Sequence, residues 1–326
     1  MQELPSSAAT VGADPTIEMA REIAESLARR PREIPAKYLY DALGSKLFDA
    51  ICELPWYRIT RGEHRLLTAH ARAIMTASGG CDTVVELGGG SGAKLSVLLD
   101  AADGRALDAH LVDISPAALA QSARTLASHL SVTLHAHEAD YEAGVRAALR
   151  RRRTDGRALV LFLGSNIGNL APGEADRFLR ELRSACRPGD LLLLGADLVK
   201  PEPELLLAYD DPLGLTAAFN KNVLARLNRE LDADFDLHEF DHCVEWNAGA
   251  SRIEVYLVSR TEQLVCVRGA GCCISIDEGE RIWTESSYKY EPAGIVEMGG
   301  RAGFKVREQW IETESRFALT LFASDP

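Results

Sequence analysis

The sequence predicts an α/β protein with a mainly parallel β-sheet and an additional, smaller α+β part. Short apolar runs alternate with amphipathic stretches from about residue 80 to 200, as expected for repeated strand–helix units. This alternation stops after Lys200, and two strand-like runs close the chain. A length of 326 residues, of which 46% are hydrophobic, is sufficient for a large core and a second, smaller unit.

Five strands are expected in the alternating region, at residues 82–88, 110–115, 131–137, 158–164 and 191–199. Helices are expected between them. Residues 115–130 should form one of these helices, because Ser115 is a good N-cap and Pro116 suits the first helical position.

The region after Lys200 has a different pattern. An amphipathic segment, TAAFNKNVLARLNREL, precedes the strand-like runs SRIEVYLVSR and EQLVCVRG, which indicates an inserted subdomain. The last 35 residues contain a predicted helix after Pro292 and the strands FKVREQWIE and FALTLFA, separated by TES, which predicts an antiparallel hairpin. We therefore expect one domain at 62–199 and 290–326, and a second at 15–61 and 200–289.

The overall charge argues against polyanionic partners. A formal net charge of -12 gives no general attraction to phosphate backbones or anionic lipid, so neither nucleic acid nor a membrane is an expected partner. The basic run at residues 150–153 is isolated and is expected to be a solvated helix end. The N-terminal sequence MQELPSSAATVGADP lacks the basic start and apolar stretch of a secretory signal, and no apolar run approaches the roughly 18 residues that span a bilayer. A cytoplasmic monomer is expected.

The seven cysteines are odd in number and have no C-x-x-C spacing, so neither a disulfide framework nor a zinc site is indicated. Reduced, mostly buried thiols are expected, and no metal. The adjacent pair Cys272 and Cys273 leaves an oxidant-sensing role open.

A glycine-rich turn is the strongest motif. In VVELGGGSGAK, a β-branched strand ends in Glu86 and runs through Gly88, Gly90 and Gly92 before a helix. Glycines permit the positive φ angles of a tight turn and let a ligand approach the backbone closely. The run also fits G-x-G-x-x-A, so a methyltransferase, a dinucleotide-binding enzyme and a structural turn all remain open. The closing antiparallel hairpin favours a methyltransferase sheet over an all-parallel dinucleotide-binding sheet.

Two acidic residues follow the next strands. Asp113 comes 25 residues after Gly88, where a carboxylate can accept hydrogen bonds from both hydroxyls of a ribose. Asp140 follows the third strand, where a carboxylate can accept from an adenine amine while Tyr141 packs on the ring. The alternative for Asp140 is a helix cap.

Polar residues in three other segments are candidates for binding an acceptor. FLGSNIGNL follows the fourth strand and contains Asn169, whose amide suits a carboxylate or amine, although a turn asparagine is the alternative. AYDDPLGLTAAFNKN contains Tyr209 and Thr216, which taken alone would be ordinary surface or capping residues. In TESSYKY, Glu285 and Ser287 share one face of an extended segment and could bind the two nitrogens of an imidazole, the alternative being an exposed polar face.

Together with PAKYLYDALGSKLFDAICELPWY, LLLGADLVK and AYDDPLGLTAAFNKNVLARLNRELDADFDL, these motifs resemble the L-histidine Nα-methyltransferases of ergothioneine biosynthesis, from about Pro35 to the C-terminus. The resemblance implies a Rossmann-like class I methyltransferase sheet, with a substrate-binding domain formed by the N-terminal segment and the insertion. It implies S-adenosylmethionine as the methyl donor, L-histidine as the acceptor and the betaine hercynine as the product.

The resemblance also implies a role for particular residues. S-adenosylmethionine would be held by Tyr40, Gly88, Lys94, Asp113, Asp140 and Tyr141. Histidine would be contacted by Tyr57, Asn169, Tyr209, Glu285 and Ser287, with Asn169 and Tyr209 at its carboxylate and Glu285 and Ser287 at its imidazole. Gly164 would lie beside the amine, Thr216 in the acceptor pocket, and Phe48 would help to line the site. Tyr40, Tyr57 and Asn169 would orient the amine for methyl transfer, and Tyr40 and Asn169 are the candidate catalytic residues.

Two departures from the family pattern bear on the acceptor. Val255 stands where the family carries a methionine, and Arg58 and Ile59 replace a tyrosine–proline pair. A shorter side chain at position 255 could admit a larger acceptor such as tryptophan, whereas Glu285 favours an imidazole over an indole. Another amino acid or a biogenic amine, a nicotinamide-dependent oxidoreductase and a non-catalytic cofactor-binding regulator are the alternative functions.

Overall fold

The computed structural model describes residues 15–152 and 156–325. The N-terminal sequence interpreted above as lacking a secretory signal lies almost wholly outside these residues. Two compact units divide the chain. Among the described residues, the smaller unit contains 15–39, 217–243 and 255–285, and the larger contains 40–152, 156–216, 244–254 and 286–325.

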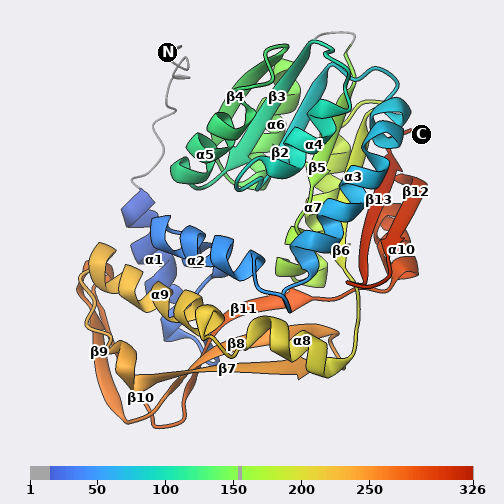
Figure 1. Cartoon of the computed structure of the whole chain (residues 1–326). Coiled ribbons are helices and arrows are strands. Elements are labelled where there is room, and N and C mark those ends of the chain that lie inside the picture. The colour runs from blue at the N-terminus through green and yellow to red at the C-terminus, as the bar shows by residue number, and fades with distance from the viewer. Residues whose placement is uncertain (1–14, 153–155, 326) are drawn as a thin grey trace. The chain divides into compact units, whose positions relative to one another are not determined.

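A seven-stranded sheet forms the core of the larger unit, in the order β12-β13-β6-β5-β2-β3-β4 (Figure 1). The five expected strands are confirmed as β2 (Thr83–Leu87), β3 (Leu107–Asp113), β4 (Val132–Glu138), β5 (Ala158–Phe162) and β6 (Leu191–Asp197). Neighbours among them pair in parallel. The closing hairpin of β12 (Lys305–Glu312) and β13 (Phe317–Ala323) is also confirmed, and β13 pairs antiparallel with β6. This is the sheet expected for a class I methyltransferase.

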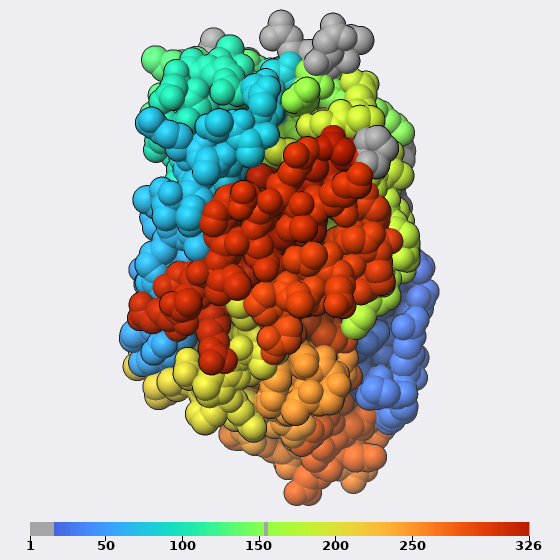
Figure 2. Space-filling view, turned by 90° about the vertical axis from the view of Figure 1, so that its right-hand side faces the viewer, coloured from blue at the N-terminus to red at the C-terminus, as the bar shows by residue number. Residues whose placement is uncertain are grey.

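Two helical layers cover this sheet. Helices α6 (Tyr141–Arg151), α7 (Pro172–Ala185) and α10 (Pro292–Arg301) share one apolar cluster with the strands. Helices α3 (Ile59–Ala77), α4 (Ala93–Asp100) and α5 (Pro116–Leu126) form the other layer (Figure 1). The expected start of α5 is confirmed, because the Ser115 hydroxyl accepts the Ala118 N–H at 3.3 Å. From α10 onward the chain forms a continuous part of the surface (Figure 2, red).

Three further helical segments of the larger unit carry candidate residues. They are α2 (Ala42–Cys52), η2 (Asn166–Asn169) and α8 (Glu202–Tyr209). Asp41 caps α2 by accepting the Gly44 N–H at 2.6 Å. Within the described part of the chain, no helix has the length and apolar character needed to cross a membrane.

The smaller unit begins with α1 (Pro15–Ala28), β1 (Arg32–Glu33) and η1 (Ala36–Leu39). It contains most of α9 (Leu215–Glu230), η3 (Leu237–Glu239) and the antiparallel pair β9 (Gln263–Val267) and β10 (Cys272–Ile276), which η4 (Arg268–Ala270) connects. A four-stranded sheet has the order β1-β11-β8-β7, and the boundary between the units runs through β7 (Phe240–Asn247), β8 (Arg252–Ser259) and β11 (Arg281–Tyr288). The amphipathic helix and the strands expected after Lys200 are therefore confirmed.

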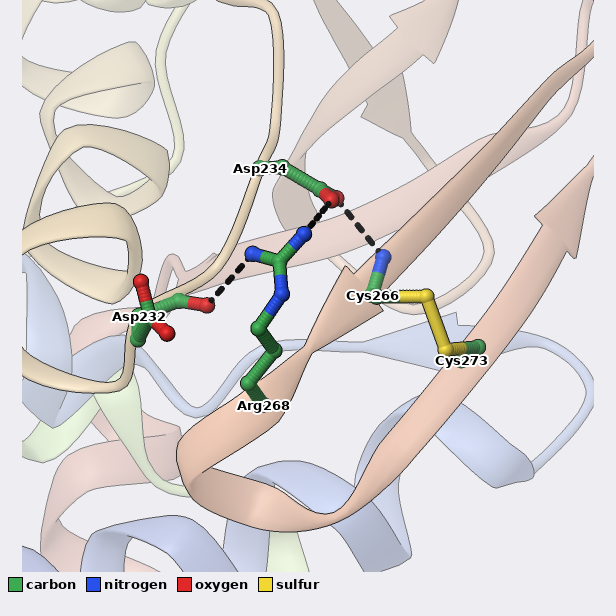
Figure 3. Close-up of a disulfide and its surroundings, with 5 residues drawn as sticks. All are labelled: Asp232, Asp234, Cys266, Arg268 and Cys273. Carbon is green, nitrogen blue, oxygen red and sulfur yellow. Dashed lines mark hydrogen bonds and ion pairs between the residues drawn. A yellow bond between two sulfur atoms is a disulfide. The ribbon is translucent and has the colours of Figure 1, made fainter.

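Two expectations from the sequence are wrong, the second only in part. Cys266 and Cys273 form a disulfide instead of remaining reduced (Figure 3). The cause is register: these residues lie opposite each other on β9 and β10, with Cα atoms 4.0 Å apart. The basic run is a solvated helix end only in part. Arg150 and Arg151 are exposed at the end of α6, as expected, but Arg152 is buried and forms an ion pair with Asp190, and Arg153 lies outside the described residues.

Candidate functional site

The glycine-rich turn joins β2 to α4 in the larger unit. Gly88, Gly90 and Gly92 have φ angles of +66°, +58° and +74°, which side chains with a Cβ rarely adopt. A Cβ on Gly88 would lie 2.8 Å from both Nδ2 of Asn166 and the hydroxyl of Tyr141. The Ser122 hydroxyl donates to the Gly90 carbonyl at 2.8 Å and ties the turn to α5. The turn therefore needs glycine both for its conformation and for its close neighbours.

Asp113 and Asp140 lie where parallel strands end. The Asp113 carboxylate accepts the Ser115 N–H at 2.9 Å, and burial raises the pKa of this carboxyl. Asp140 caps α6 by accepting the Ala143 N–H at 2.6 Å, as in the alternative interpretation of this residue. Its side chain is exposed, so a second role at a ligand remains a prediction.

Tyr141 follows Asp140 at the start of α6. Its ring packs edge-on against Phe162, with centroids 5.1 Å apart. Its hydroxyl lies beside Gly88, so Tyr141 and the glycine-rich turn meet at the carboxyl end of β2.

A buried charged cluster lies next to the turn, and the sequence analysis missed two of its three members. Glu63 on α3 is fully buried, forms an ion pair with Lys94 at 2.6 Å and accepts the Gly164 N–H at 2.7 Å. Glu86 is the last residue but one of β2 and is 1% exposed, and neither of its carboxylate oxygens has a hydrogen-bond partner among the described residues.

The pKa values in this cluster follow from burial and from its charges. Burial raises the pKa of Glu86 to about 7, against the opposing charge of Lys94. Burial alone would lower the pKa of Lys94, but Glu63 and Glu86 hold it above the ordinary value. The signal for Glu63 was present in the sequence, because on a helix this glutamate shares a face with Ile59, Leu66 and Leu67.

Four aromatic rings of the larger unit, on α2, on α8 and on the loops that flank α2, form a continuous row. The ring centroids of Tyr40 and Phe48 lie 5.5 Å apart, those of Phe48 and Tyr57 6.1 Å, and those of Tyr57 and Tyr209 6.3 Å. All three contacts are edge-on, which is a favoured geometry for aromatic pairs. The structure thus brings together four of the residues implied by the family resemblance.

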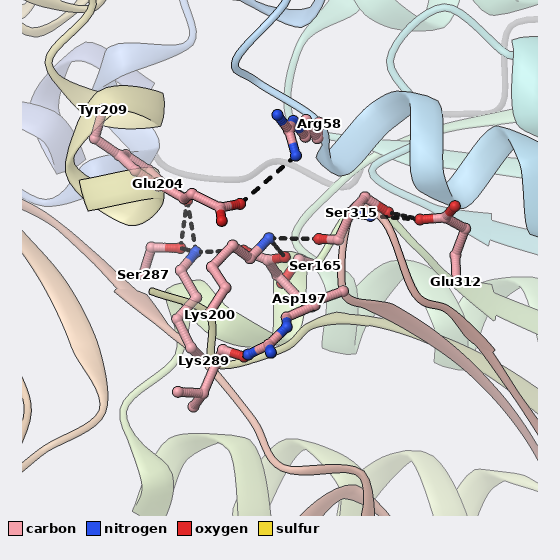
Figure 4. A network of polar contacts seen from close by, with 12 residues as sticks. Arg58, Ser165, Asp197, Lys200, Glu204, Tyr209, Ser287, Lys289, Glu312 and Ser315 are labelled. Carbon is pink, nitrogen blue, oxygen red and sulfur yellow. Dashed lines mark hydrogen bonds and ion pairs between the residues drawn. The ribbon is translucent and has the colours of Figure 1, made fainter. Parts of the chain in front are cut away.

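The hydroxyl of Tyr209 continues this row into a polar network (Figure 4). Tyr209 and Ser287 share a hydrogen bond of 2.8 Å, and the ammonium of Lys289 donates to both hydroxyls at 2.8 Å. Lys289 also pairs with Asp197 at 3.0 Å, and Asp197 pairs with Lys200 at 2.6 Å. The sequence analysis missed Lys289, although it alternates with Glu285 and Ser287 in TESSYKY.

The two lysines of this network differ in their pKa. Burial alone would lower the pKa of Lys289, but Tyr209 and Asp197 hold it above the ordinary value, so its ammonium stays charged. Burial lowers the pKa of Lys200, with Asp197 opposing the shift. A pocket lined by Trp56, Arg58, Leu205 and Ala208, among others, also borders Asp197, Lys200 and Tyr209.

Three other candidate residues of the larger unit differ in their surroundings. Gly164 has a φ of +75°, and a Cβ there would lie 2.8 Å from the Lys94 ammonium. Asn169 is exposed at the end of η2. The Thr216 hydroxyl donates to Asp211 at 2.7 Å, which is the capping role named as its alternative.

The two departures from the family pattern, at residues 58–59 and at Val255, and the candidate Glu285 have the following positions in the structure. Arg58 is exposed and pairs with Glu204 at 3.6 Å, whereas Ile59 is buried at the start of α3. Val255 and Glu285 belong to the smaller unit. Val255 is buried on β8, and its carbonyl accepts the Thr284 hydroxyl at 3.1 Å. Glu285 is half-buried on β11.

The turn after β2 in the larger unit offers polar groups that could hold S-adenosylmethionine. Glycines have no Cβ, so a ligand can approach the backbone N–H groups of this turn closely, and their φ angles are positive. Asp113 lies at the end of the adjacent strand β3. The buried carboxylate of Glu86 is an acceptor that a cationic or N–H-bearing group could satisfy. The donor set is therefore compatible with this cofactor.

Comparison with known proteins bears on the acceptor as well. A family described as "Histidine-specific methyltransferase, SAM-dependent" matches residues 19–324. A relative from Mycolicibacterium smegmatis named "Histidine N-alpha-methyltransferase" is 40% identical, over 93% of this chain and 94% of the relative. A Mycobacterium tuberculosis relative of the same name is 39% identical, over 94% and 95%. "Ergothioneine biosynthesis protein 1" of Neurospora crassa is 27% identical, over 86% of this chain and 32% of that protein.

Proposed function

Because the chain belongs to the family of histidine-specific, S-adenosylmethionine-dependent methyltransferases, we propose that it methylates the α-amino group of L-histidine. Three transfers would give the betaine hercynine, an intermediate of ergothioneine biosynthesis. The observation that carries the proposal is the hydroxyl pair of Tyr209 and Ser287, which the buried ammonium of Lys289 holds in a fixed arrangement. The two mycobacterial relatives support the acceptor, and the Neurospora crassa relative supports the pathway.

The site residues are proposed in the roles that the family resemblance implies. Cofactor contacts come from Tyr40, Gly88, Lys94, Asp113, Asp140 and Tyr141. Acceptor contacts come from Tyr57, Asn169, Tyr209, Thr216, Val255, Glu285, Ser287, Gly164 and Phe48. The cofactor-binding domain is 62–199 with 290–326, and the substrate-binding domain is 15–61 with 200–289. This division describes roles in binding, whereas the two compact units describe packing.

Bound S-adenosylmethionine supplies an electrophilic methyl group on a sulfonium. The protein must align the acceptor nitrogen with that group and bind the amine in its neutral form. No strong catalytic base is required. Tyr40, Tyr57 and Asn169 orient the amine, and its proton leaves to water or to a nearby oxygen. Partly methylated amines stay bound until the third transfer.

The buried Val255 favours one alternative acceptor, because a side chain shorter than methionine leaves more room near it. Tryptophan is the test case. We further propose that the protein is a cytoplasmic monomer that binds neither nucleic acid nor membrane.

The first experiment titrates L-histidine, L-tryptophan and L-tyrosine calorimetrically into protein saturated with S-adenosylhomocysteine, and then measures methylation by mass spectrometry. Histidine alone should bind and gain three methyl groups. Tighter binding of tryptophan would transfer the function to that acceptor. Cofactor binding without turnover on any amine would indicate a regulator and refute the enzyme.

Two variants test the site within that experiment. Asn169→Ala and Tyr209→Phe should each raise KM for histidine at least tenfold, or about 1.4 kcal/mol, the scale of a hydrogen bond to a charged group. Tyr38→Phe is the matched control, because Tyr38 donates to Glu22 within the smaller unit, at 2.7 Å, and has no proposed role. Unchanged kinetics in both site variants would refute the assignment.

A further inference from the structure

Glu63 lies in a space that a glycine leaves open over β6. One of its carboxylate oxygens accepts the Gly164 N–H at 2.7 Å, and a Cβ on Gly195 would lie 2.2 Å from that same oxygen. A side chain at position 195 would therefore displace the carboxylate. The Glu63 side chain is 0% exposed, so it is held inside the protein and does not contact a ligand directly.

Lys94 is the member of this ion pair that a ligand can reach. Its ammonium lies 2.6 Å from the other carboxylate oxygen of Glu63, and its side chain is 23% exposed. Among the residues that the structure describes, Lys94 forms no second ion pair. Burial alone would lower its pKa, but Glu63 and Glu86 hold that pKa above the ordinary value, so the ammonium stays charged. An ammonium has three N–H donors, and Glu63 does not use all of them, so an anion can bind there.

Without Glu63, Lys94 would have a competing partner within the cluster. Both carboxylate oxygens of Glu86 are buried and lack a hydrogen-bond partner among the described residues, and Glu86 already attracts Lys94. A buried charge is costly unless it is paired, and the flexible stem of a lysine allows its ammonium to move toward such a partner. Glu63 holds the ammonium beside Gly164 instead, where a Cβ would lie 2.8 Å from the Lys94 Nζ atom.

The proposed cofactor has one group that an ammonium would bind. The carboxylate of the amino-acid end is the only anionic group of S-adenosylmethionine and of S-adenosylhomocysteine. We propose that Glu63 is a positioning residue that holds the Lys94 ammonium in place for this carboxylate. The proposal rests on the proposed function for the role of Lys94 at the cofactor, but not for the identity of the acceptor. The effect of Glu63 passes through Lys94 alone.

The test compares S-adenosylhomocysteine with its decarboxylated analogue, which differs by the carboxylate alone. Both are titrated calorimetrically into wild type, Glu63→Gln, Lys94→Met and the double variant. Glu63→Gln should weaken binding of S-adenosylhomocysteine at least tenfold, the scale of a hydrogen bond to a charged group, and binding of the analogue less than threefold. In the Lys94→Met background, Glu63→Gln should weaken binding of S-adenosylhomocysteine less than threefold, because the two residues act on the carboxylate as one unit.

Further variants separate the position of the ammonium from its charge. In a Glu86→Gln background, Lys94 has no second carboxylate to pair with, so Glu63→Gln should weaken binding of S-adenosylhomocysteine less than threefold. Gly164→Ala keeps every charge but places a Cβ 2.8 Å from the Lys94 ammonium, so it should reproduce the selective loss. It also carries the test if Glu63→Gln shows no cooperative urea transition. Glu181→Gln removes an exposed carboxylate that pairs with Arg146 and should change neither affinity.

Three results would overturn the proposal. They are an affinity of Glu63→Gln for S-adenosylhomocysteine that is within threefold of wild type or tighter, equal losses for the two ligands, and additive effects of the Glu63 and Lys94 substitutions. Tighter binding would show that Glu63 merely screens the charge of Lys94. A wild type that binds both ligands equally would also overturn the proposal, and it would leave the proposed function standing. A wild type that distinguishes the ligands as expected but does not methylate L-histidine would refute the proposed function alone.

Discussion

Replacing Glu63 with glutamine should destabilise the larger unit, because it breaks an ion pair between a fully buried carboxylate and a partly buried ammonium with almost no change in shape. Glu63 is fully buried and lies 2.6 Å from the Lys94 ammonium. At an effective dielectric constant of about 20, unit charges at that distance attract by roughly 6 kcal/mol, most of which offsets the cost of burying both. Removing one partner leaves the other charge uncompensated and typically costs about 3–5 kcal/mol.

The environment places Glu63→Gln at the lower end of that range. Glutamine can still accept the Gly164 N–H, and Glu86 still attracts Lys94. We therefore expect a loss of about 3 kcal/mol in the free energy of unfolding, or a decrease in Tm of about 4 °C for a chain of this size.

Urea unfolding followed by tryptophan fluorescence measures this loss, with calorimetry for Tm. Lys94→Met should cost a similar amount, and the double variant should cost clearly less than the sum, with a coupling of about 2 kcal/mol or more. Glu181→Gln is the matched control, because its pair with Arg146 is exposed and should contribute less than about 1 kcal/mol. A loss below about 1 kcal/mol for Glu63→Gln, or an additive double variant, would refute the reasoning.

Three other substitutions have definite expected outcomes. Burial raises the pKa of Glu86 from 4.5 to about 7, so the folded state binds the extra proton between these values and stability falls as pH rises through them. Glu86→Gln should therefore be more stable than wild type by about 3 kcal/mol at pH 8 but not at pH 4.5, and equal gains at both would contradict this. Burial, with the stacked imidazole rings of His135 and His137 and the charge of Arg151, lowers the pKa of His110 from 6.5 to about 3. The unfolded state then binds the extra proton, so the free energy of unfolding should fall below pH 6.5 by up to about 1.4 kcal/mol per pH unit. His110→Asn should make the urea midpoint depend less on pH between pH 7 and pH 4. An unchanged pH dependence of that midpoint would refute the assignment. Gly88→Ala would place a Cβ 2.8 Å from the Tyr141 hydroxyl at a φ of +66°. Calorimetry should therefore show at least tenfold weaker binding of S-adenosylhomocysteine, and urea unfolding should show a loss of about 1–2 kcal/mol in the free energy of unfolding. Binding within threefold of wild type would show that the turn tolerates a side chain.

Helix caps and strand positions could be predicted from the sequence, because they depend on residues that are near each other in the chain. The cap at Ser115 and the strand bounds around the glycine-rich turn were correct, because they depend on neighbouring residues and on periodicity. Asp140 shows the limit of this approach, since a carboxylate at a strand end can serve a cap or a ligand, and the structure shows the cap. Its role at a cofactor stays a prediction.

By itself, the sequence determined the class of sheet, the antiparallel ending at β13 and the family, because alternating apolar runs and a glycine-rich turn are encoded in consecutive residues. Only the tertiary structure decided which distant residues meet. Glu63 reaches Gly164 across 101 positions, Lys289 reaches Tyr209 across 80, and the register of two strands pairs Cys266 with Cys273. Buried charges and disulfides depend on the distance between side chains in space, and that distance is determined by packing rather than by periodicity along the chain.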